Sequence, residues 1–241
     1  MREIFYLHGM GGNASDWLEL QRISGGTAIS LNPDCDSFSE LCLDTTKKIQ
    51  LLAKTNSNVL LCGYSLGGRV ALSIAESLEK SLTGKLALLL LSAGLGFSSV
   101  AEREDRAQKD LDWAALADQD LNEFWQKWYQ QALFSTFPHL PLSLRETWIR
   151  DRKTINSLYL RRQLVDWSPA QHEYLRPTLQ NLGSRMPVYY AAGSEDSVYR
   201  KLGESFAAQT QIRVEILPGI GHILPLEAPT EIAQIISKIN F

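Results

Sequence analysis

The sequence predicts an α/β protein with a mostly parallel, doubly wound sheet. Six short apolar runs rich in Val, Ile, Leu and Tyr alternate with helical patterns, and such alternation is typical of parallel sheets. The runs are continuously apolar, as in strands that are covered on both faces. The expected strands cover residues 3–7, 28–31, 58–62, 86–92, 187–192 and 212–217, and the expected helices cover residues 15–23, 38–53, 68–80, 199–208 and 229–239.

One segment lacks this alternation of expected strands and helices. Residues 96–182 contain helical patterns, for example over 120–134 and 142–165, but no strand run. We therefore expect one structural unit, with a core formed by residues 1–95 and 183–241 and a helical lid inserted over residues 96–182.

Composition excludes several classes of protein. With 44% hydrophobic and 21% charged residues and a net charge of −3, the chain has neither a disordered composition nor the basic field of a nucleic-acid or anionic-membrane binder. It holds no apolar run of the roughly 20 residues that a spanning helix needs, and its first residues do not resemble a secretory signal. We expect a cytoplasmic protein, a monomer or a weak homo-oligomer.

The cysteines predict neither a disulfide framework nor a metal site. Cys35, Cys42 and Cys62 are odd in number and form no CxxC or Cys/His cluster. We interpret them as reduced packing residues and expect no metal and no organic cofactor.

The sharpest motif is Gly63-Tyr64-Ser65-Leu66-Gly67, which directly follows one expected strand and precedes a helical pattern. A G-x-S-x-G sequence in that context is a nucleophile elbow, in which flanking glycines allow a strained turn to project the serine. Ser65 would then lie at a helix N-terminus, where the Leu66 N–H can stabilise an oxyanion. The structural alternative is an ordinary glycine-rich turn.

A serine nucleophile or base needs an imidazole and a carboxylate. His222 follows the last expected strand and Asp196 follows the preceding one, so both belong at the carboxyl edge of the sheet. The chain order Ser, Asp, His is that of the α/β-hydrolase fold. The alternatives are a solvated loop histidine, and for Asp196 a helix N-cap, with Glu195 competing for the carboxylate role.

The loop after the first expected strand completes this picture. It reads His8-Gly-Met10-Gly-Gly, and an α/β-hydrolase fold keeps its second oxyanion N–H at this point. We expect Met10 to donate through its backbone and His8 to shape the loop.

Beyond the triad, the chain resembles one family in detail. The run GYSLGGR at 63–69, the segment 102–110, WYQQ at 128–131 followed by Leu133 and Phe134, and GSEDSVYRKL at 193–202 are similar to the MenH family. Its members are 2-succinyl-6-hydroxy-2,4-cyclohexadiene-1-carboxylate synthases of menaquinone and phylloquinone biosynthesis. The resemblance covers essentially the whole chain, and the lid motifs are its specific part.

The resemblance implies a lyase that eliminates pyruvate from 2-succinyl-5-enolpyruvyl-6-hydroxy-3-cyclohexene-1-carboxylate, a small-molecule tricarboxylate. Ser65, activated by His222, would remove a ring proton, and the Met10 and Leu66 N–H groups would receive the enolate charge. Residues that match the family's substrate-binding positions are Tyr64, Arg69, Arg106, Trp128 and Arg152. Arginine suits carboxylates because its donors are planar and permanently charged.

Two departures from the family pattern leave alternatives open. Residues 138–142 look like a short insertion, so Arg150 competes with Arg152 for one position, and Met10 stands where the family often has an aromatic residue. The competing functions are a carboxylesterase or carbon–carbon bond hydrolase of the same fold, and a non-catalytic protein that keeps the fold.

Overall fold

Six strands form a single parallel sheet in the computed structural model, which describes residues 2–207 and 211–241. The strand order is β2-β1-β3-β4-β5-β6. The chain therefore winds first to one side of β1 and then to the other, and the predicted doubly wound α/β class is confirmed. The strands are β1 (Arg2–Leu7), β2 (Thr27–Ile29), β3 (Asn58–Tyr64), β4 (Leu86–Leu91), β5 (Val188–Gly193) and β6 (Arg213–Leu217).

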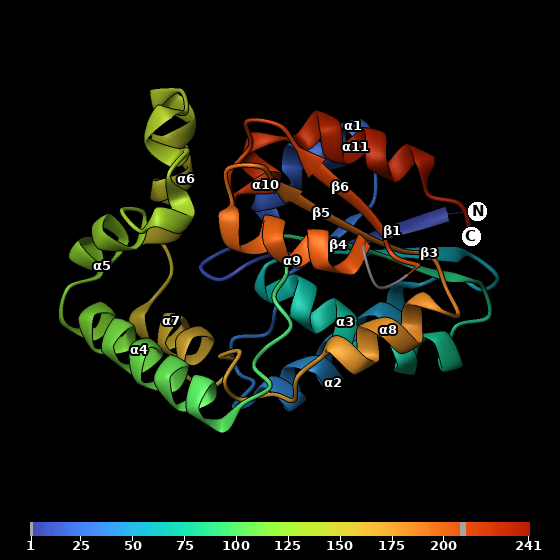
Figure 1. The fold of residues 1–241 in the computed structure, drawn as a ribbon, viewed down its shortest axis with the longest axis horizontal. Coiled ribbons are helices and arrows are strands. Elements are labelled where there is room, and N and C mark those ends of the chain that lie inside the picture. Colours follow the sequence, from blue (N-terminus) through green and yellow to red (C-terminus); the bar gives the residue numbers. More distant parts are fainter. Residues whose placement is uncertain (1, 208–210) are drawn as a thin grey trace.

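Helices cover both faces of this sheet (Figure 1). Helices α2, α3, α8 and α9 contribute buried residues to the core on one face, and α1, α10 and α11 to the core on the other. The bounds are α1 (Leu18–Ser24, after the 3-10 turn η1, Ala14–Trp17), α2 (Phe38–Leu52), α3 (Leu66–Ser81), α8 (Arg176–Gly183), α9 (Ser197–Ala207), α10 (Leu224–Glu227) and α11 (Pro229–Lys238).

Double coverage explains the continuous apolar runs. In β1, Phe5 and Leu7 join the core beneath α2 and α3, whereas Ile4 and Tyr6 join the core beneath α1 and α11. Successive side chains of a strand point to opposite faces, so both sets must be apolar. All six expected strands occur, with ends displaced by no more than two residues. The helix expected over 199–208 corresponds to α9, and residue 208 lies outside the described residues.

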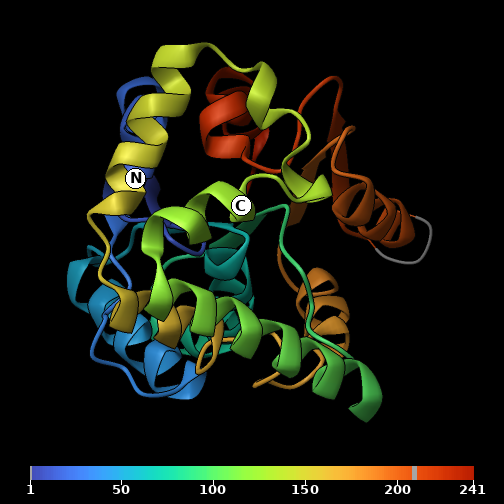
Figure 2. The ribbon, with the colours of Figure 1, turned by 90° about the vertical axis from the view of Figure 1, so that its left-hand side faces the viewer.

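The inserted segment forms a separate group of helices with its own apolar core. Figure 1 shows α4 to α7 on the side of the sheet opposite the chain termini, and Figure 2 looks onto them. Their bounds are α4 (Val100–Gln119), α5 (Leu121–Trp128), the 3-10 turns η2 (Ala132–Phe134) and η3 (Phe137–His139), α6 (Leu142–Lys153) and α7 (Ser157–Leu164). Helix α8, which follows them, packs against α3.

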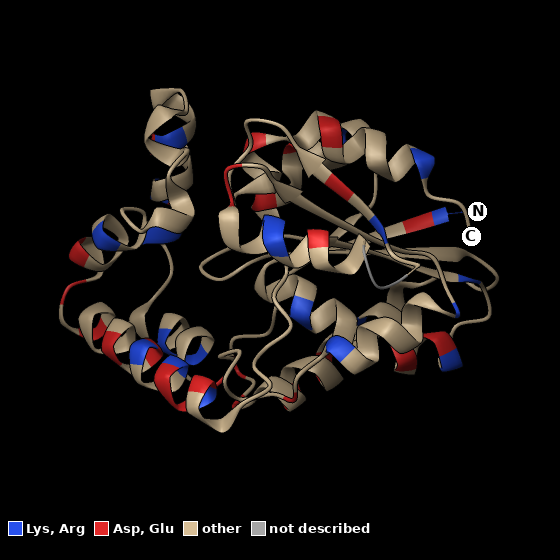
Figure 3. Ribbon diagram, viewed as in Figure 1, with Lys and Arg blue, Asp and Glu red and all other residues tan. Residues whose placement is uncertain are grey.

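Local sequence explains where the lid starts. Ser99 and Glu102 form a capping box, in which each side chain bonds the backbone N–H of the other residue. Acidic and basic residues then alternate along α4 (Figure 3), and ion pairs four residues apart, such as Lys109 with Asp105, support an exposed helix. The 142–165 pattern is divided into α6 and α7, because Asn156 caps a new helix by accepting from the Tyr159 N–H.

The stability of the core rests on the central strands. Leu89 in β4 is fully buried, whereas Leu51 at the end of α2 is 85% exposed. Leu89→Ala should lower the free energy of unfolding by about 2–5 kcal/mol, because a cavity replaces the lost methyl groups. Leu51→Ala is the matched control and should change it by less than about 0.5 kcal/mol. Urea unfolding followed by circular dichroism measures both, and equal effects would contradict this assignment of the core.

Candidate active site

Ser65 lies at the tip of the turn between β3 and α3, with φ 52° and ψ −110°. A positive φ is unfavourable for a residue with a side chain and persists only where the surroundings enforce it. Here the Ser65 N–H donates to the Leu91 carbonyl of β4 at 2.9 Å, which ties the turn to the sheet. The side chain of Ser65 therefore stands at the carboxyl edge of the central strands, as the elbow motif predicts.

Close packing requires the glycines of this motif. A Cβ atom on Gly63 would collide with the backbone of Gly67, and one on Gly67 would collide with the carbonyl oxygen of Leu7. Helix α3 thus begins in direct backbone contact with the ends of β3 and β1. No residue with a side chain fits at either position without displacing the elbow.

Asp196 and His222 meet at the same edge of the sheet, although 26 residues separate them. Asp196 follows β5 and His222 follows β6, and both side chains are almost completely buried. The His222 Nδ1 lies 2.7 Å from Asp196 Oδ2. A carboxylate at Nδ1 favours the tautomer that carries its proton there, which leaves Nε2 as the acceptor.

The alternative carboxylate, Glu195, points elsewhere. Its side chain is exposed and accepts a hydrogen bond from Ser194 Oγ at 2.8 Å. Asp196 also serves the cap role considered for it, because its Oδ1 accepts from the Tyr199 N–H at 3.3 Å. Its two oxygens thus orient the histidine and the start of α9 together.

His222 faces the serine across a shared cavity of about 430 Å³. Three aromatic rings surround the imidazole, those of Tyr64, Phe134 and Tyr199, with centroid separations of 5.4, 5.7 and 4.8 Å. Among the described residues no hydrogen bond joins Ser65 Oγ to His222. Such bonds are often long in ligand-free sites and tighten when substrate binds. Ser65 and His222 line the same cavity, and Asp196 contacts the imidazole at Nδ1 without lining the cavity itself.

The two expected oxyanion donors belong to different segments, the loop after β1 and the start of α3. Met10 and Leu66 both line the cavity. The Leu66 N–H belongs to the first residue of α3, where unpaired donors and the helix dipole favour negative charge. Met10 lies in a tight turn closed by a hydrogen bond from the Gly12 N–H to the Gly9 carbonyl at 3.1 Å.

His8 shapes this turn, as expected. Its Nδ1 lies 2.9 Å from the Gly9 carbonyl oxygen, and its Nε2 accepts from the Leu31 N–H at 3.1 Å. Burial lowers the pKa of His8 below its usual value, so the ring stays neutral and can both donate and accept. His8 is therefore a structural residue of the loop.

Arg69 brings an uncompensated positive charge to the cavity wall. The side chain is buried on α3, and its Nη1 donates to the Trp167 carbonyl at 2.9 Å. Burial, and then the nearby Arg106 guanidinium, lower the pKa of Arg69 to about 10, so it stays charged at neutral pH. No ion pair neutralises it within the residues that the structure describes. A buried cation without an anion is costly unless a ligand supplies one.

Arg106 reaches the same end of the cavity from α4. Its Nε lies 2.8 Å from Asp110 Oδ2, and that oxygen also accepts from Ser168 Oγ at 2.6 Å. The buried Asp110 thus orients Arg106, whose side chain stays 35% exposed. Two arginines therefore face one carboxylate, which leaves a net positive charge at this end.

Arg152 is not brought to the cavity. Its guanidinium is 1% exposed and binds both oxygens of Asp16 at 2.8 and 2.9 Å. It also donates to the Tyr129 hydroxyl at 3.2 Å and stacks on Trp148, and those two rings line the cavity in its place. The competing Arg150 is exposed on the outer side of α6 and lines a different groove. A buried acid within reach explains why Arg152 turns inward.

Tyr64 and Trp128, the remaining expected positions, do line the cavity. Tyr64 precedes the serine and is buried, which raises the pKa of its hydroxyl well above the usual value. Trp128 stacks on Phe124 and meets Trp113 edge to face, so one ring serves both the lid core and the cavity wall.

Several residues of the cavity wall were not predicted as site residues from the sequence, among them Trp113, Gln163 and Tyr199. Tyr199 could have been found, because it lies one helical turn after Asp196 at the same sheet edge. Gln163 and Trp113 carry no signal of their own, since a single Gln or Trp in an amphipathic helix is typical of surface or core packing.

In the described parts of the chain, no group of three or more His, Cys, Asp or Glu side chains is arranged to hold a metal ion. The three cysteines are all free thiols. Within the same residues, no helix combines the length and apolar character needed to cross a membrane.

A parallel sheet with a strained serine after β3 and a buried Asp–His pair after β5 and β6 defines the class of α/β-hydrolase-fold proteins. The chain belongs to the alpha/beta hydrolase family, whose model matches residues 4–235.

Relatives within this family carry a more specific name. The 2-succinyl-6-hydroxy-2,4-cyclohexadiene-1-carboxylate synthase of Yersinia pestis is 28% identical over 91% of this chain and 80% of its own length. The synthase of the same name from Klebsiella pneumoniae is 28% identical over 98% of this chain and 92% of its own length. Among solved structures, MenH from S. aureus superposes with a TM-score of 0.86 at 20% identity, covering 98% of this chain and 92% of its own.

The buried pair Asp16–Arg152 joins the core to the lid, and its removal should be costly. Asp16→Asn should lower the free energy of unfolding by about 3–5 kcal/mol, because it leaves a buried guanidinium without its counter-charge. The exposed pair Lys127–Glu123 on α5 is the control, and Glu123→Gln should cost less than about 1 kcal/mol. If chemical unfolding showed equal decreases in the free energy of unfolding for both variants, the buried pair would contribute no more to stability than the exposed one.

Proposed function

We propose that this protein is a lyase that eliminates pyruvate from 2-succinyl-5-enolpyruvyl-6-hydroxy-3-cyclohexene-1-carboxylate to form 2-succinyl-6-hydroxy-2,4-cyclohexadiene-1-carboxylate. The observation that carries the proposal is the cavity whose wall contains Ser65, His222 and the uncompensated Arg69. The synthase names of the relatives in Yersinia pestis and Klebsiella pneumoniae agree with this reaction.

The arginines would bind the substrate's carboxylates. Guanidinium groups form paired, charge-assisted hydrogen bonds to carboxylates, and a ligand carboxylate would supply the anion that Arg69 lacks. Arg106, already oriented by Asp110, would bind a second carboxylate from the lid side. The aromatic wall that contains Tyr64 and Trp128 would pack against the ring and the succinyl chain.

Proton removal would start the reaction. His222, oriented by Asp196, would take the Ser65 proton, and the serine oxygen would remove the ring proton next to the succinyl ketone. As the C–H bond breaks, its electron pair becomes an enolate whose charge collects on the ketone oxygen. The Met10 and Leu66 N–H groups would hydrogen-bond that oxygen.

Collapse of the enolate would complete the elimination. The electron pair at ring carbon 2 forms a double bond to carbon 3, the existing double bond moves from carbons 3 and 4 to carbons 4 and 5, and the bond from carbon 5 to the enolpyruvyl oxygen breaks. The leaving group departs as the enolate of pyruvate and takes up a proton to give pyruvate. This series of reaction steps needs neither an acyl-enzyme nor a hydrolytic water.

We also propose roles for the parts of the chain. Within the inserted segment 96–182, helices α4 to α7 would act as a lid over the core of residues 1–95 and 183–241, which α8 joins, and would exclude water from the enolate. The reaction would take place in the cytoplasm, where unpaired thiols such as Cys35, Cys42 and Cys62 stay reduced. The enzyme would act as a monomer or a weak homo-oligomer, with the small-molecule tricarboxylate as its partner.

Pyruvate release tests the reaction and the serine together. The wild-type protein should release pyruvate from the enolpyruvyl substrate, measured with lactate dehydrogenase and NADH. Ser65→Ala should reduce kcat about a thousandfold or more, because the proton relay is interrupted. Ser143→Ala, on the exposed start of α6, is the control and should retain full activity. Fast turnover of nitrophenyl esters without pyruvate release would favour a carboxylesterase.

The anion site has its own test. Arg69→Gln and Arg106→Gln should each raise KM about tenfold or more, because each removes a charged hydrogen bond of about 1.5–3 kcal/mol. Arg161→Gln is the control, since this lid arginine is exposed and pairs with Asp118 at 3.1 Å. Steady-state kinetics with the same coupled assay measures all three. An unchanged KM in both cavity variants would eliminate the anion-binding role.

A further inference from the structure

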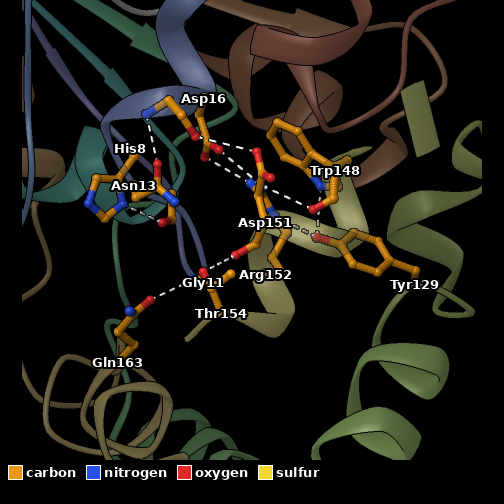
Figure 4. A network of polar contacts seen from close by, with 12 residues as sticks. His8, Gly11, Asn13, Asp16, Tyr129, Trp148, Asp151, Arg152, Thr154 and Gln163 are labelled. Atoms are coloured by element: carbon orange, nitrogen blue, oxygen red, sulfur yellow. Dashed lines mark hydrogen bonds and ion pairs between the residues drawn. The ribbon is translucent and has the colours of Figure 1, made fainter. Parts of the chain in front are cut away.

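Helices α5, α6 and α7 contact the segment after β1 directly, and two of these contacts lie on Gly11 of the oxyanion turn itself. Gln163 of α7 accepts a hydrogen bond from the Gly11 N–H at 2.6 Å, across 152 residues of chain. The Trp125 ring of α5 packs so closely on Gly11 that a Cβ atom there would collide with it. Arg152 of α6 binds Asp16, a few residues further along the loop. Figure 4 shows the Gln163 and Arg152 contacts converging on the segment after β1.

The Gly11 N–H belongs to the part of the turn that sets the backbone conformation of Met10. The bond from the Gly12 N–H to the Gly9 carbonyl closes it, and Gly11 has a φ of 67°, as the third residue of a type II turn does. The Gly11 N–H then belongs to the central peptide, which it shares with the Met10 carbonyl. Because a peptide is planar, holding this N–H fixes the backbone on the carboxyl side of Met10, the proposed oxyanion donor.

The Gln163 side chain is held in one orientation. It is 2% exposed, and within the described residues its buried Nε2 makes no well-formed hydrogen bond and has only a weak contact with the Tyr159 hydroxyl. Exchanging the amide oxygen and nitrogen would place a donor against the Gly11 N–H. The amide therefore keeps its acceptor on Gly11 and leaves its donor poorly satisfied, an arrangement that lowers stability.

Because the buried amide donor lowers stability, the presence of Gln163 at this position is explained better by a functional role than by a contribution to folding. The bidentate Asp16–Arg152 pair already anchors the lid to the same loop. An apolar residue at position 163, between Leu160 and Leu164 of the lid core, would bury no poorly satisfied donor. Local arrangements that lower stability concentrate at functional sites, and this one ends on the oxyanion turn.

We propose that Gln163 is a positioning residue for catalysis, through which the lid holds the Gly9–Gly12 turn in the geometry that directs the Met10 N–H into the cavity. The inference rests on the proposed function in assigning Met10 as an oxyanion donor. It adds that the oxyanion site is assembled from both parts of the chain. A seated lid thus completes the catalytic site as well as covering it.

Two variants separate this role from simple packing. Gln163→Leu removes the hydrogen-bond acceptor and places an apolar side chain of similar size in the same buried position. Gln163→Glu keeps an oxygen for the Gly11 N–H and removes the amide donor. The control is Gln126→Leu, on the exposed face of α5. Thermal unfolding of each variant verifies that it folds.

The first readout needs no substrate. Amide hydrogen exchange at Gly11, followed by NMR on protein labelled with ¹⁵N-glycine, should become at least about tenfold faster in Gln163→Leu, because the N–H loses its acceptor. Exchange should stay near the wild-type rate in Gln163→Glu and Gln126→Leu. Unchanged Gly11 exchange in folded Gln163→Leu would overturn the proposal, whether or not the protein releases pyruvate.

The second readout is kinetic, with whichever substrate the wild-type protein turns over. In Gln163→Leu, kcat should fall about 10- to 100-fold, as for a misplacement of about 1 Å in a catalytic group, while KM stays within about threefold. A raised KM with unchanged kcat would make Gln163 a substrate contact and would also overturn the proposal. Absence of pyruvate release by the wild type would refute the proposed reaction and leave the exchange result valid.

Discussion

The backbone contact between α3 and the ends of β1 and β3 is the constraint on which the site depends. Only because Gly63 and Gly67 lack side chains can the helix begin against the carbonyl oxygen of Leu7, and only then does the turn force Ser65 to a φ of 52°. The same contact brings the start of α3 beside the loop that follows β1. The strained turn thus sets the position of the Ser65 side chain and of the Leu66 N–H that follows it.

Compensation of charge decides what each arginine does. Arg152 is fully paired with Asp16, and this pair links the core to the lid. Arg69 is also buried, but in the described structure it has a carbonyl and the Phe38 ring as partners and no carboxylate in an ion pair, and its lowered pKa reflects that environment. Arg106 lies between the two, oriented by Asp110 yet partly open to the cavity. An incomplete ion pair in a cavity wall indicates a place for an anionic ligand.

Two of the polar contacts between the lid and the loop after β1 differ in physical character. The Asp16–Arg152 pair is satisfied on every side and contributes to holding the two parts together. The Gln163–Gly11 bond leaves a buried donor poorly satisfied and ends on the turn beside the serine. An insertion of this kind can therefore influence chemistry through the backbone of the core, without touching the reacting atoms itself.

The sequence alone determined the fold class, the six strands and the inserted helices. It also predicted that Ser65, Asp196 and His222 lie at the same edge of the sheet. Those features follow from local patterns, since apolar runs, an elbow motif and strand ends specify where a residue lies on a parallel sheet. Only the tertiary structure showed that Arg69 lines the cavity whereas Arg152 is paired with Asp16. It also showed that Gln163 and Trp113 belong to the cavity wall. The role of a polar side chain depends on its partner, and Asp16 and Gly11 are more than 130 residues away from theirs. No local pattern encodes a pairing at that distance.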